Sequence, residues 1–216
     1  RRSRRCGSHG CNLDRLGRRA DDVKRAVFLD RDGNVCEDVG YLGDPSKLVV
    51  FPYAAEAVRR INESSMLAIL VTNQSGVARG HFDEDAVLRV NDRLERELAR
   101  GGARLDGIYY CPHHPTIGQP PYRQSCECRK PRPGMLVRAA ADHDIDLSQS
   151  FVVGDKYSDV RLAHEAGARA VLVRTGYGRG EWEYDRATWP RQPEHVAETL
   201  EDAVEWILDE AGKEQP

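Results

Sequence analysis

Short apolar runs alternate with longer amphipathic stretches from Arg25 onward. Short apolar runs bounded by polar residues are typical of strands that are buried on both faces of a sheet, whereas apolar residues at i, i+3 and i+4 are typical of helices that cover it. The pattern predicts strands at residues 26–29, 67–71, 108–110, 151–153 and 170–173. It predicts helices at residues 52–64, 83–100, 133–143, 158–167 and 196–211.

The regular alternation of strands and helices indicates an α/β fold with a doubly wound, Rossmann-like parallel sheet. Residues 25–212 are expected to form this single domain, with an irregular Pro- and Cys-rich loop inserted at 111–128. The connections between the predicted elements are short, so we expect no large cap domain. Residues 1–24 are polar and Arg-rich, and we expect them to form a flexible tail.

The composition narrows the class of protein. The 216-residue chain is 40% hydrophobic and has a formal net charge of −3, so it can bury a core and lacks an overall basic field for nucleic acid. Its longest apolar runs are too short to span a membrane. The Arg-rich N-terminal residues lack the apolar core of a signal peptide, which favours a cytoplasmic protein. No apolar stripe demands a protein partner, so we expect a monomer.

The segment 176–195 is not assigned to an element or a motif. It contains Trp182 and Trp189, and we expect these side chains to serve in packing or in a partner contact rather than in chemistry.

Chemically active side chains follow directly after predicted strands. Parallel sheets place their ligand sites beyond the carboxyl ends of the strands. The residues at these ends are Asp30, Thr72, Cys111 and Asp155. Their positions therefore predict one site at one edge of the sheet.

The segment Asp30-Arg31-Asp32-Gly33 carries a pair of carboxylates suited to phosphoryl transfer. Residues i and i+2 on an extended backbone point the same way, and a divalent cation relieves the repulsion between their charges. One carboxylate can attack phosphorus while the other protonates the leaving oxygen. By itself, the same segment is also typical of an acidic corner on a protein surface.

Three further motifs could complete a phosphate site. A hydroxyl and amides at a strand end can hold phosphate oxygens, and such groups occur at Thr72, Asn73, Gln74 and Ser75. Lys130, in Arg129-Lys130-Pro131, could neutralise charge on the transferring phosphoryl group. Asp155 could complete a magnesium site. Alone, each motif also fits an ordinary turn, a solvated basic pair or a helix cap.

The order of these motifs, each beside a predicted strand end, resembles the haloacid dehalogenase-like phosphatases between about residues 26 and 175. The resemblance implies that Asp30 is the nucleophile and Asp32 the acid/base. It also implies that Thr72 and Lys130 stabilise the transferred phosphoryl group. Magnesium would bind the Asp30 carboxylate, the Asp32 main-chain carbonyl and the Asp155 carboxylate.

A second metal site is indicated by the spacing Cys-x-His, twelve residues, Cys-x-Cys. Three thiolates and one imidazole form a closed tetrahedral set for structural zinc, and the set consists of Cys111, His113, Cys126 and Cys128. We choose His113 over His114 because positions 111 and 113 share a face of an extended segment. The alternatives are free cysteines beside a Pro-rich loop and a catalytic zinc ion.

The zinc motif narrows the resemblance to the heptose 1,7-bisphosphate 7-phosphatases and the related histidinol-phosphate phosphatases. The heptose branch implies removal of the C7 phosphate of D-glycero-D-manno-heptose 1,7-bisphosphate during nucleotide-activated heptose synthesis. It implies that Arg129 recognises the distal phosphate, that Lys156 contacts substrate and that the sugar is held by Asp38, Val39, Gly40 and Tyr41. Histidinol-phosphate hydrolysis and a non-catalytic, zinc-stapled phosphate-binding module remain alternatives, and the motifs do not specify the sugar anomer.

Overall fold

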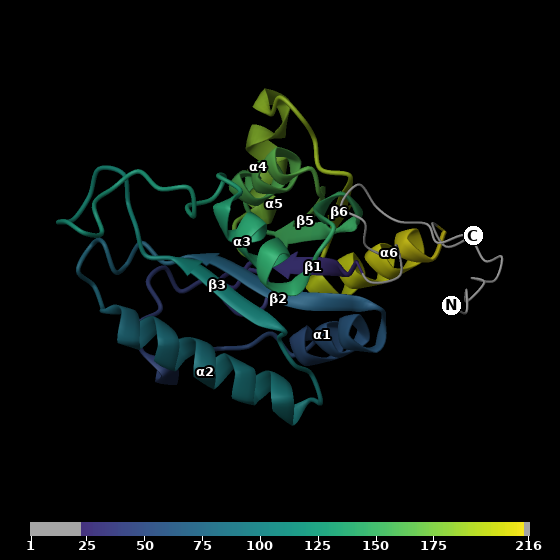
Figure 1. Cartoon of the computed structure of the whole chain (residues 1–216), viewed down its shortest axis with the longest axis horizontal. Coiled ribbons are helices and arrows are strands. Elements are labelled where there is room, and N and C mark those ends of the chain that lie inside the picture. Colours follow the sequence, from purple (N-terminus) through teal and green to yellow (C-terminus); the bar gives the residue numbers. More distant parts are fainter. Residues whose placement is uncertain (1–22, 214–216) are drawn as a thin grey trace, which may run out of the picture.

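A computed structural model describes residues 23–213. Its centre is a parallel sheet of six strands in the order β3-β2-β1-β4-β5-β6 (Figure 1). The strands are β1 (Arg25–Leu29), β2 (Met66–Asn73), β3 (Gly107–Cys111), β4 (Phe151–Gly154), β5 (Arg169–Val173) and β6 (His195–Ala197). The predicted α/β fold with a doubly wound parallel sheet is confirmed.

Helices cover both faces of the sheet. One face carries α1 (Ala54–Glu63), α2 (Glu84–Arg100) and α6 (Leu200–Lys213), and the other carries α3 (Gly134–His143) and α4 (Tyr157–Ala166). Figure 1 shows α1 and α2 below the sheet and α3 and α4 above it. Shorter helical turns are η2 (Pro45–Lys47), η3 (Leu147–Gln149), α5 (Gly178–Gly180), η4 (Glu181–Asp185) and η5 (Arg186–Thr188).

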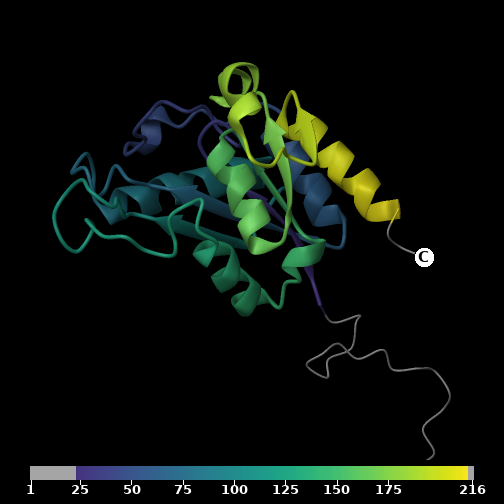
Figure 2. The ribbon, with the colours of Figure 1, turned by 90° about the horizontal axis from the view of Figure 1, so that it is seen from above.

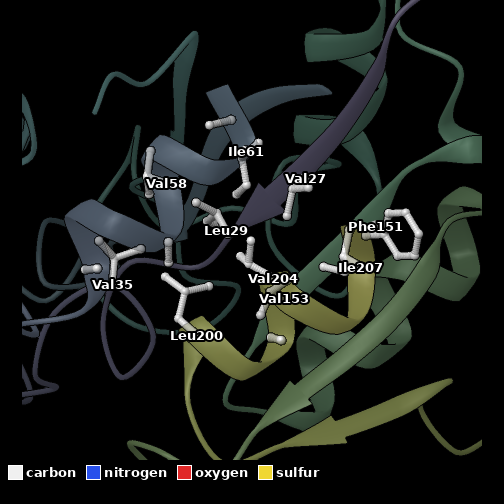
Figure 3. Close-up of a cluster of buried hydrophobic side chains, with 14 of the residues drawn as sticks. Val27, Leu29, Val35, Val58, Ile61, Phe151, Val153, Leu200, Val204 and Ile207 are labelled. Atoms are coloured by element: carbon white, nitrogen blue, oxygen red, sulfur yellow. The ribbon is translucent and has the colours of Figure 1, made fainter. Parts of the chain in front are cut away.

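Alternation along β1 divides the core into two layers. Val27 and Leu29 pack toward α1 and α6 (Figure 3), while Ala26 and Phe28 pack toward α3 and α4. All four side chains are fully buried. Because β1 is central and apolar on both faces, its end is a rigid support for Asp30.

Two elements begin where the sequence carries a capping signal. The side chain of Asp83, the first residue of the predicted helix at 83–100, accepts a hydrogen bond from the Ala86 amide and caps α2. The predicted helix at 196–211 is wrong at its start, because residues 195–197 form β6. Thr199 and Asp202 then exchange side-chain to backbone hydrogen bonds before α6. The three residues of β6 are too few to show the alternation of a strand in the sequence, whereas the capping box of Thr199 and Asp202 marks the start of α6.

The ends of the domain and segment 176–195 add three observations. Most of the predicted tail, residues 1–22, lies outside the described residues, while Lys24 already forms a parallel bridge with Ile145. Trp189 stacks on Tyr157 with ring centroids 4.5 Å apart, so this tryptophan packs as expected. Within residues 23–213, every helix falls short of the length and apolarity that a membrane crossing requires.

The loop between β3 and α3 extends from the sheet at the end where β1 stops, in the view from above (Figure 2). It is the longest irregular connection of the described chain and holds the predicted zinc ligands. Its position brings the residues after Cys128 back toward the carboxyl ends of the strands, where the candidate site lies.

Candidate active site and metal centres

Asp30 follows β1 directly and its carboxylate is buried. The Asp30 amide donates to the Val153 carbonyl at 2.9 Å, so the ladder between β1 and β4 fixes the backbone. Asp30 Oδ1 lies 2.9 Å from Lys130 Nζ and accepts a hydrogen bond of 2.7 Å from the Arg31 amide. These contacts hold the carboxylate in one orientation, as the role of a nucleophile requires.

Lys130 is a fully buried cation shared by two carboxylates. Its ammonium lies 2.9 Å from Asp30 and 2.6 Å from Asp159. Burial lowers the pKa of this amine, but the charges of Asp159 and Asp30 outweigh burial and raise the pKa above its usual value. Asn73 exchanges hydrogen bonds with the Lys130 backbone at 3.1 and 3.3 Å, which anchors the loop to the end of β2.

Asp32 is held from two sides. The completely buried Arg31 guanidinium donates two hydrogen bonds to its carboxylate, at 2.9 and 3.0 Å, and a third to Asn91 of α2 at 3.0 Å. Gln74 donates to Asp32 Oδ2 and to the Thr72 hydroxyl, both at 2.9 Å. The predicted acid/base and the predicted phosphoryl-binding hydroxyl therefore share one amide.

Asp155 offers a ligand atom for a cation. Its Oδ2 accepts from the Tyr177 amide at 2.8 Å, while Oδ1 is buried without a hydrogen-bond partner among the described residues. Burial, followed by the charge of Asp30, raises the pKa of Asp155 to about 8. A divalent cation would favour the ionised form, and carboxylate oxygens of Asp30, Asp155 and Asp159 lie within 4.8 Å of one another. The residues therefore fit a magnesium ion.

A cavity of about 400 Å³ opens over the carboxylates of Asp30 and Asp32. It is lined by most of the residues predicted to bind substrate or phosphate, namely Asp30, Asp32, Asp38, Gly40, Tyr41, Thr72, Asn73, Gln74, Ser75, Arg129, Lys130 and Lys156. Val39 is about half exposed and is not among the residues that line it. Two segments distant in sequence meet at the rim, where Lys156 Nζ lies 3.0 Å from Asp38 Oδ2.

Sequence reasoning missed three contributors to this site. Asp159 balances Lys130, and its position four residues after Asp155 was the available signal. Arg31 donates hydrogen bonds to Asp32, and it was missed because a charged residue between two acidic residues is typical of an exposed position. Tyr177 lines the cavity from a segment that the motifs left unassigned.

The four predicted zinc ligands form one cluster. The sulfur of Cys126 lies 3.6 Å from that of Cys111 and 3.3 Å from that of Cys128, and His113 Nδ1 is 3.4 Å from the Cys128 sulfur. Corners of a tetrahedron with Zn–S bonds of about 2.3 Å lie about 3.8 Å apart. The hydrogen bond with Cys111 lowers the pKa of Cys128 to about 5, whereas the hydrogen bond with Cys128 raises the pKa of Cys111 and burial raises that of Cys126. A bound zinc ion would favour the thiolate form of all three. The cluster therefore fits zinc.

His114 lies outside this cluster. Its Nδ1 accepts hydrogen bonds from the Thr116 and Ile117 amides at 3.2 and 3.0 Å, and its Nε2 faces Arg79 at 3.3 Å. Burial and the nearby arginines lower the pKa of this imidazole, which favours the neutral ring. His114 therefore stabilises the turn that follows it in the loop.

The zinc cluster is joined directly to the active site. Arg129 follows Cys128 in the chain, and its guanidinium donates to the His113 carbonyl at 3.0 Å. On the outer side of the loop, the hydroxyls of Tyr110 and Tyr122 donate to the Glu84 carboxylate at 2.7 and 2.9 Å. Folding of the loop around a metal would therefore fix both Arg129 and the following Lys130.

We expect metal analysis to find about one equivalent of zinc per chain, and Cys128→Ser to reduce it. Loss of zinc should lower the thermal midpoint and raise KM for a phosphate ester, because Arg129 and Lys130 lose their support. Cys36→Ser is the control for zinc content alone, since Cys36 is a buried cysteine outside the cluster, beside Asp32. A fully active, zinc-free wild-type protein would refute the structural-zinc prediction.

Comparisons with known proteins agree with this geometry. A family model described as HAD-hydrolase-like matches residues 127–203. D-glycero-D-manno-heptose-1,7-bisphosphate 7-phosphatase from Thermosynechococcus vestitus is 45% identical over 191 residues, which are 84% of this chain and 94% of the relative. D-glycero-beta-D-manno-heptose-1,7-bisphosphate 7-phosphatase from Pasteurella multocida is 45% identical over 155 residues, which are 71% and 84% of the two chains.

A solved structure extends the likeness to three dimensions. D,D-heptose 1,7-bisphosphate phosphatase from B. bronchiseptica, complexed with magnesium and phosphate, superposes with a TM-score of 0.76 at 34% identity. The match covers 86% of this chain and 99% of that one. The resemblance inferred from the motifs is thereby confirmed, and the chain belongs to the heptose-1,7-bisphosphate 7-phosphatase family of HAD-like hydrolases.

Proposed function

We propose that this chain hydrolyses the C7 phosphate of D-glycero-D-manno-heptose 1,7-bisphosphate through a phosphoryl-enzyme on Asp30. The observation that carries the proposal is the pair of Asp30 and Asp32 in one cavity that Arg129, Lys130 and Lys156 also line. Three cations lining one cavity suit a substrate that carries two phosphates. The names of the family members support the same substrate.

In the first step, an Asp30 carboxylate oxygen attacks phosphorus and the bond from phosphorus to the C7 oxygen breaks. The leaving oxygen takes a proton from Asp32. Lys130 and the Thr72 hydroxyl stabilise charge on the transferring group. Arg31 and Gln74 keep the Asp32 carboxyl facing the cavity.

In the second step, Asp32 accepts a proton from water, the water oxygen attacks phosphorus, and the acyl-phosphate bond breaks to restore Asp30. Magnesium would be held by the Asp30 and Asp155 carboxylates and the Asp32 carbonyl, and when bound its charge offsets the repulsion between nucleophile and phosphate. The burial of Lys130 and Asp155 keeps bulk water away from the charges on which both steps depend.

Phosphate release from both anomers of heptose 1,7-bisphosphate and from histidinol phosphate tests the proposal. We expect the highest kcat/KM with the β anomer, the form that the Pasteurella relative's name specifies. A higher kcat/KM for histidinol phosphate would overturn the proposed substrate. We also expect a cytoplasmic monomer, which cell fractionation and light scattering would check.

A further inference from the structure

Tyr177 occupies a defined place on the wall of the active-site cavity. It lies in segment 176–195, just beyond β5, and more than half of its surface is exposed. Its backbone is fixed independently of its side chain, because its amide donates to Asp155 and the preceding Gly176 has a φ of +53°. A Cβ on Gly176 would lie 2.2 Å from Asp155 Oδ2, so the chain must pass close to that carboxylate. The ring can therefore be changed without moving Asp155.

The ring of Tyr177 faces a cation. Lys156 Nζ lies 4.4 Å from the ring centroid, 3.0 Å from Asp38 Oδ2 and 3.8 Å from Asp155 Oδ1. An ammonium over an aromatic ring is attracted by the ring's negative face. The ring and the two carboxylates together confine a lysine that would otherwise sample many rotamers. Among the described residues the Tyr177 hydroxyl has no hydrogen-bond partner, so the contact with Lys156 is made by the ring face.

Lys156 is separate from the cation at the reacting phosphate. Lys130 is buried between Asp30 and Asp159, whereas one third of the Lys156 side chain is exposed at the rim. The carboxylate that holds Lys156 belongs to the loop after β1, where Asp38 also accepts from the Gly40 amide at 2.7 Å. Three segments thus meet around one ammonium at the mouth of the cavity.

We propose that Tyr177 is a specificity-determining residue, whose ring face sets Lys156 against the non-reacting end of the substrate and forms a wall for its sugar. This inference rests on the proposed function, because a substrate without a distal anion or sugar would not use either contact. Tyr177 does not take part in the chemical step. Its loss should therefore change recognition of the large substrate while leaving transfer from a minimal phosphate donor intact.

The test compares Tyr177→Phe, Tyr177→Leu and Tyr177→Ala on heptose 1,7-bisphosphate and on acetyl phosphate, which has neither sugar nor distal anion. With the bisphosphate we expect Phe to stay within about twofold of wild type and Ala to raise KM roughly 5- to 20-fold. Leu keeps bulk without an aromatic face and should approach Ala. All kcat values, and KM for acetyl phosphate, should stay within about twofold. Tyr184→Ala is the matched control, because Tyr184 is 80% exposed in the same segment and does not line the cavity.

Each other outcome overturns the inference. Equal losses on both substrates would show that Tyr177 acts through Asp155. A wild-type KM for the bisphosphate in Tyr177→Ala or Tyr177→Leu would show that the ring face has no role. A KM for Tyr177→Phe as high as that for Tyr177→Ala would assign the effect to the hydroxyl. The wild-type protein reports on the proposed function separately, since failure to hydrolyse the bisphosphate would sink that function whatever the variants do.

Discussion

Asp30→Asn should abolish turnover, with a loss on the order of 10⁴-fold or more in kcat. A carboxamide has nearly the same shape as the carboxylate but is a poor nucleophile toward phosphorus. The fold should persist, because the backbone bond from residue 30 to Val153 and the packing of β1 do not depend on the ionised group, and Lys130 keeps Asp159 as a buried counter-ion. Phosphate release under saturating magnesium measures the loss, and circular dichroism with metal analysis checks fold and zinc content.

Asp85→Asn is a suitable control for this variant, since Asp85 is exposed in the first turn of α2, and its activity should match wild type. Wild-type turnover by Asp30→Asn would rule out the aspartyl-phosphate mechanism. A loss accompanied by unfolding or by missing zinc would instead assign Asp30 a structural role and contradict the expectation.

Lys130→Met should damage both activity and stability. Methionine fills similar space but leaves the carboxylates of Asp30 and Asp159 buried without their shared cation. Breaking a buried ion pair by removing one partner costs about 3–5 kcal/mol, and loss of a cation at a transferring phosphoryl group lowers kcat by about 10²–10³-fold. Urea unfolding and phosphate release would measure the two effects.

The stability loss in Lys130→Met should depend on pH. Burial, opposed by the charge of Lys130, already raises the pKa of Asp159 to about 6, and removal of Lys130 would raise it further. The folded variant then binds a proton that the unfolded chain releases above about pH 4. Its deficit relative to wild type should therefore shrink as pH falls from 7 toward 4. A pH-independent deficit would contradict this account, and Lys47→Met, in an exposed turn, should stay within about 0.5 kcal/mol of wild type.

The parts of the site that could be predicted are those fixed by local pattern. A buried apolar run followed by a polar residue marks a strand end, and this placed Asp30, Thr72 and Asp155 at one edge of a parallel sheet. The zinc ligands were also predicted from local pattern, since the Cys-x-His and Cys-x-Cys spacings each bring two ligands together within three residues. The structure joins the two pairs in one cluster.

The parts that could not be predicted depend on contacts between distant segments. Arg31 is buried because Asn91, sixty residues later, meets it from α2. Asp159 sits in the first turn of α4, a position usually exposed, and is buried between Gly154 of β4 and Lys130 of the distant loop. The three residues of β6 carry no period and become a strand by pairing with β5. Lys130 was expected beside a strand end but lies in the irregular loop between β3 and α3, and its motif alone fitted a solvated basic pair equally well.

The pairing of β1 with β4 has a consequence for how the molecule is made. The Asp30 backbone bonds to Val153, which enters the chain more than a hundred residues later, after the zinc loop and α3. Pairing at such separation is slow to form and cannot begin on a ribosome until β4 has emerged. A chain stalled or cut anywhere before that strand holds the nucleophile's sequence without its geometry. Truncated chains of this enzyme would therefore be inactive and would not hydrolyse the cell's phosphate esters indiscriminately.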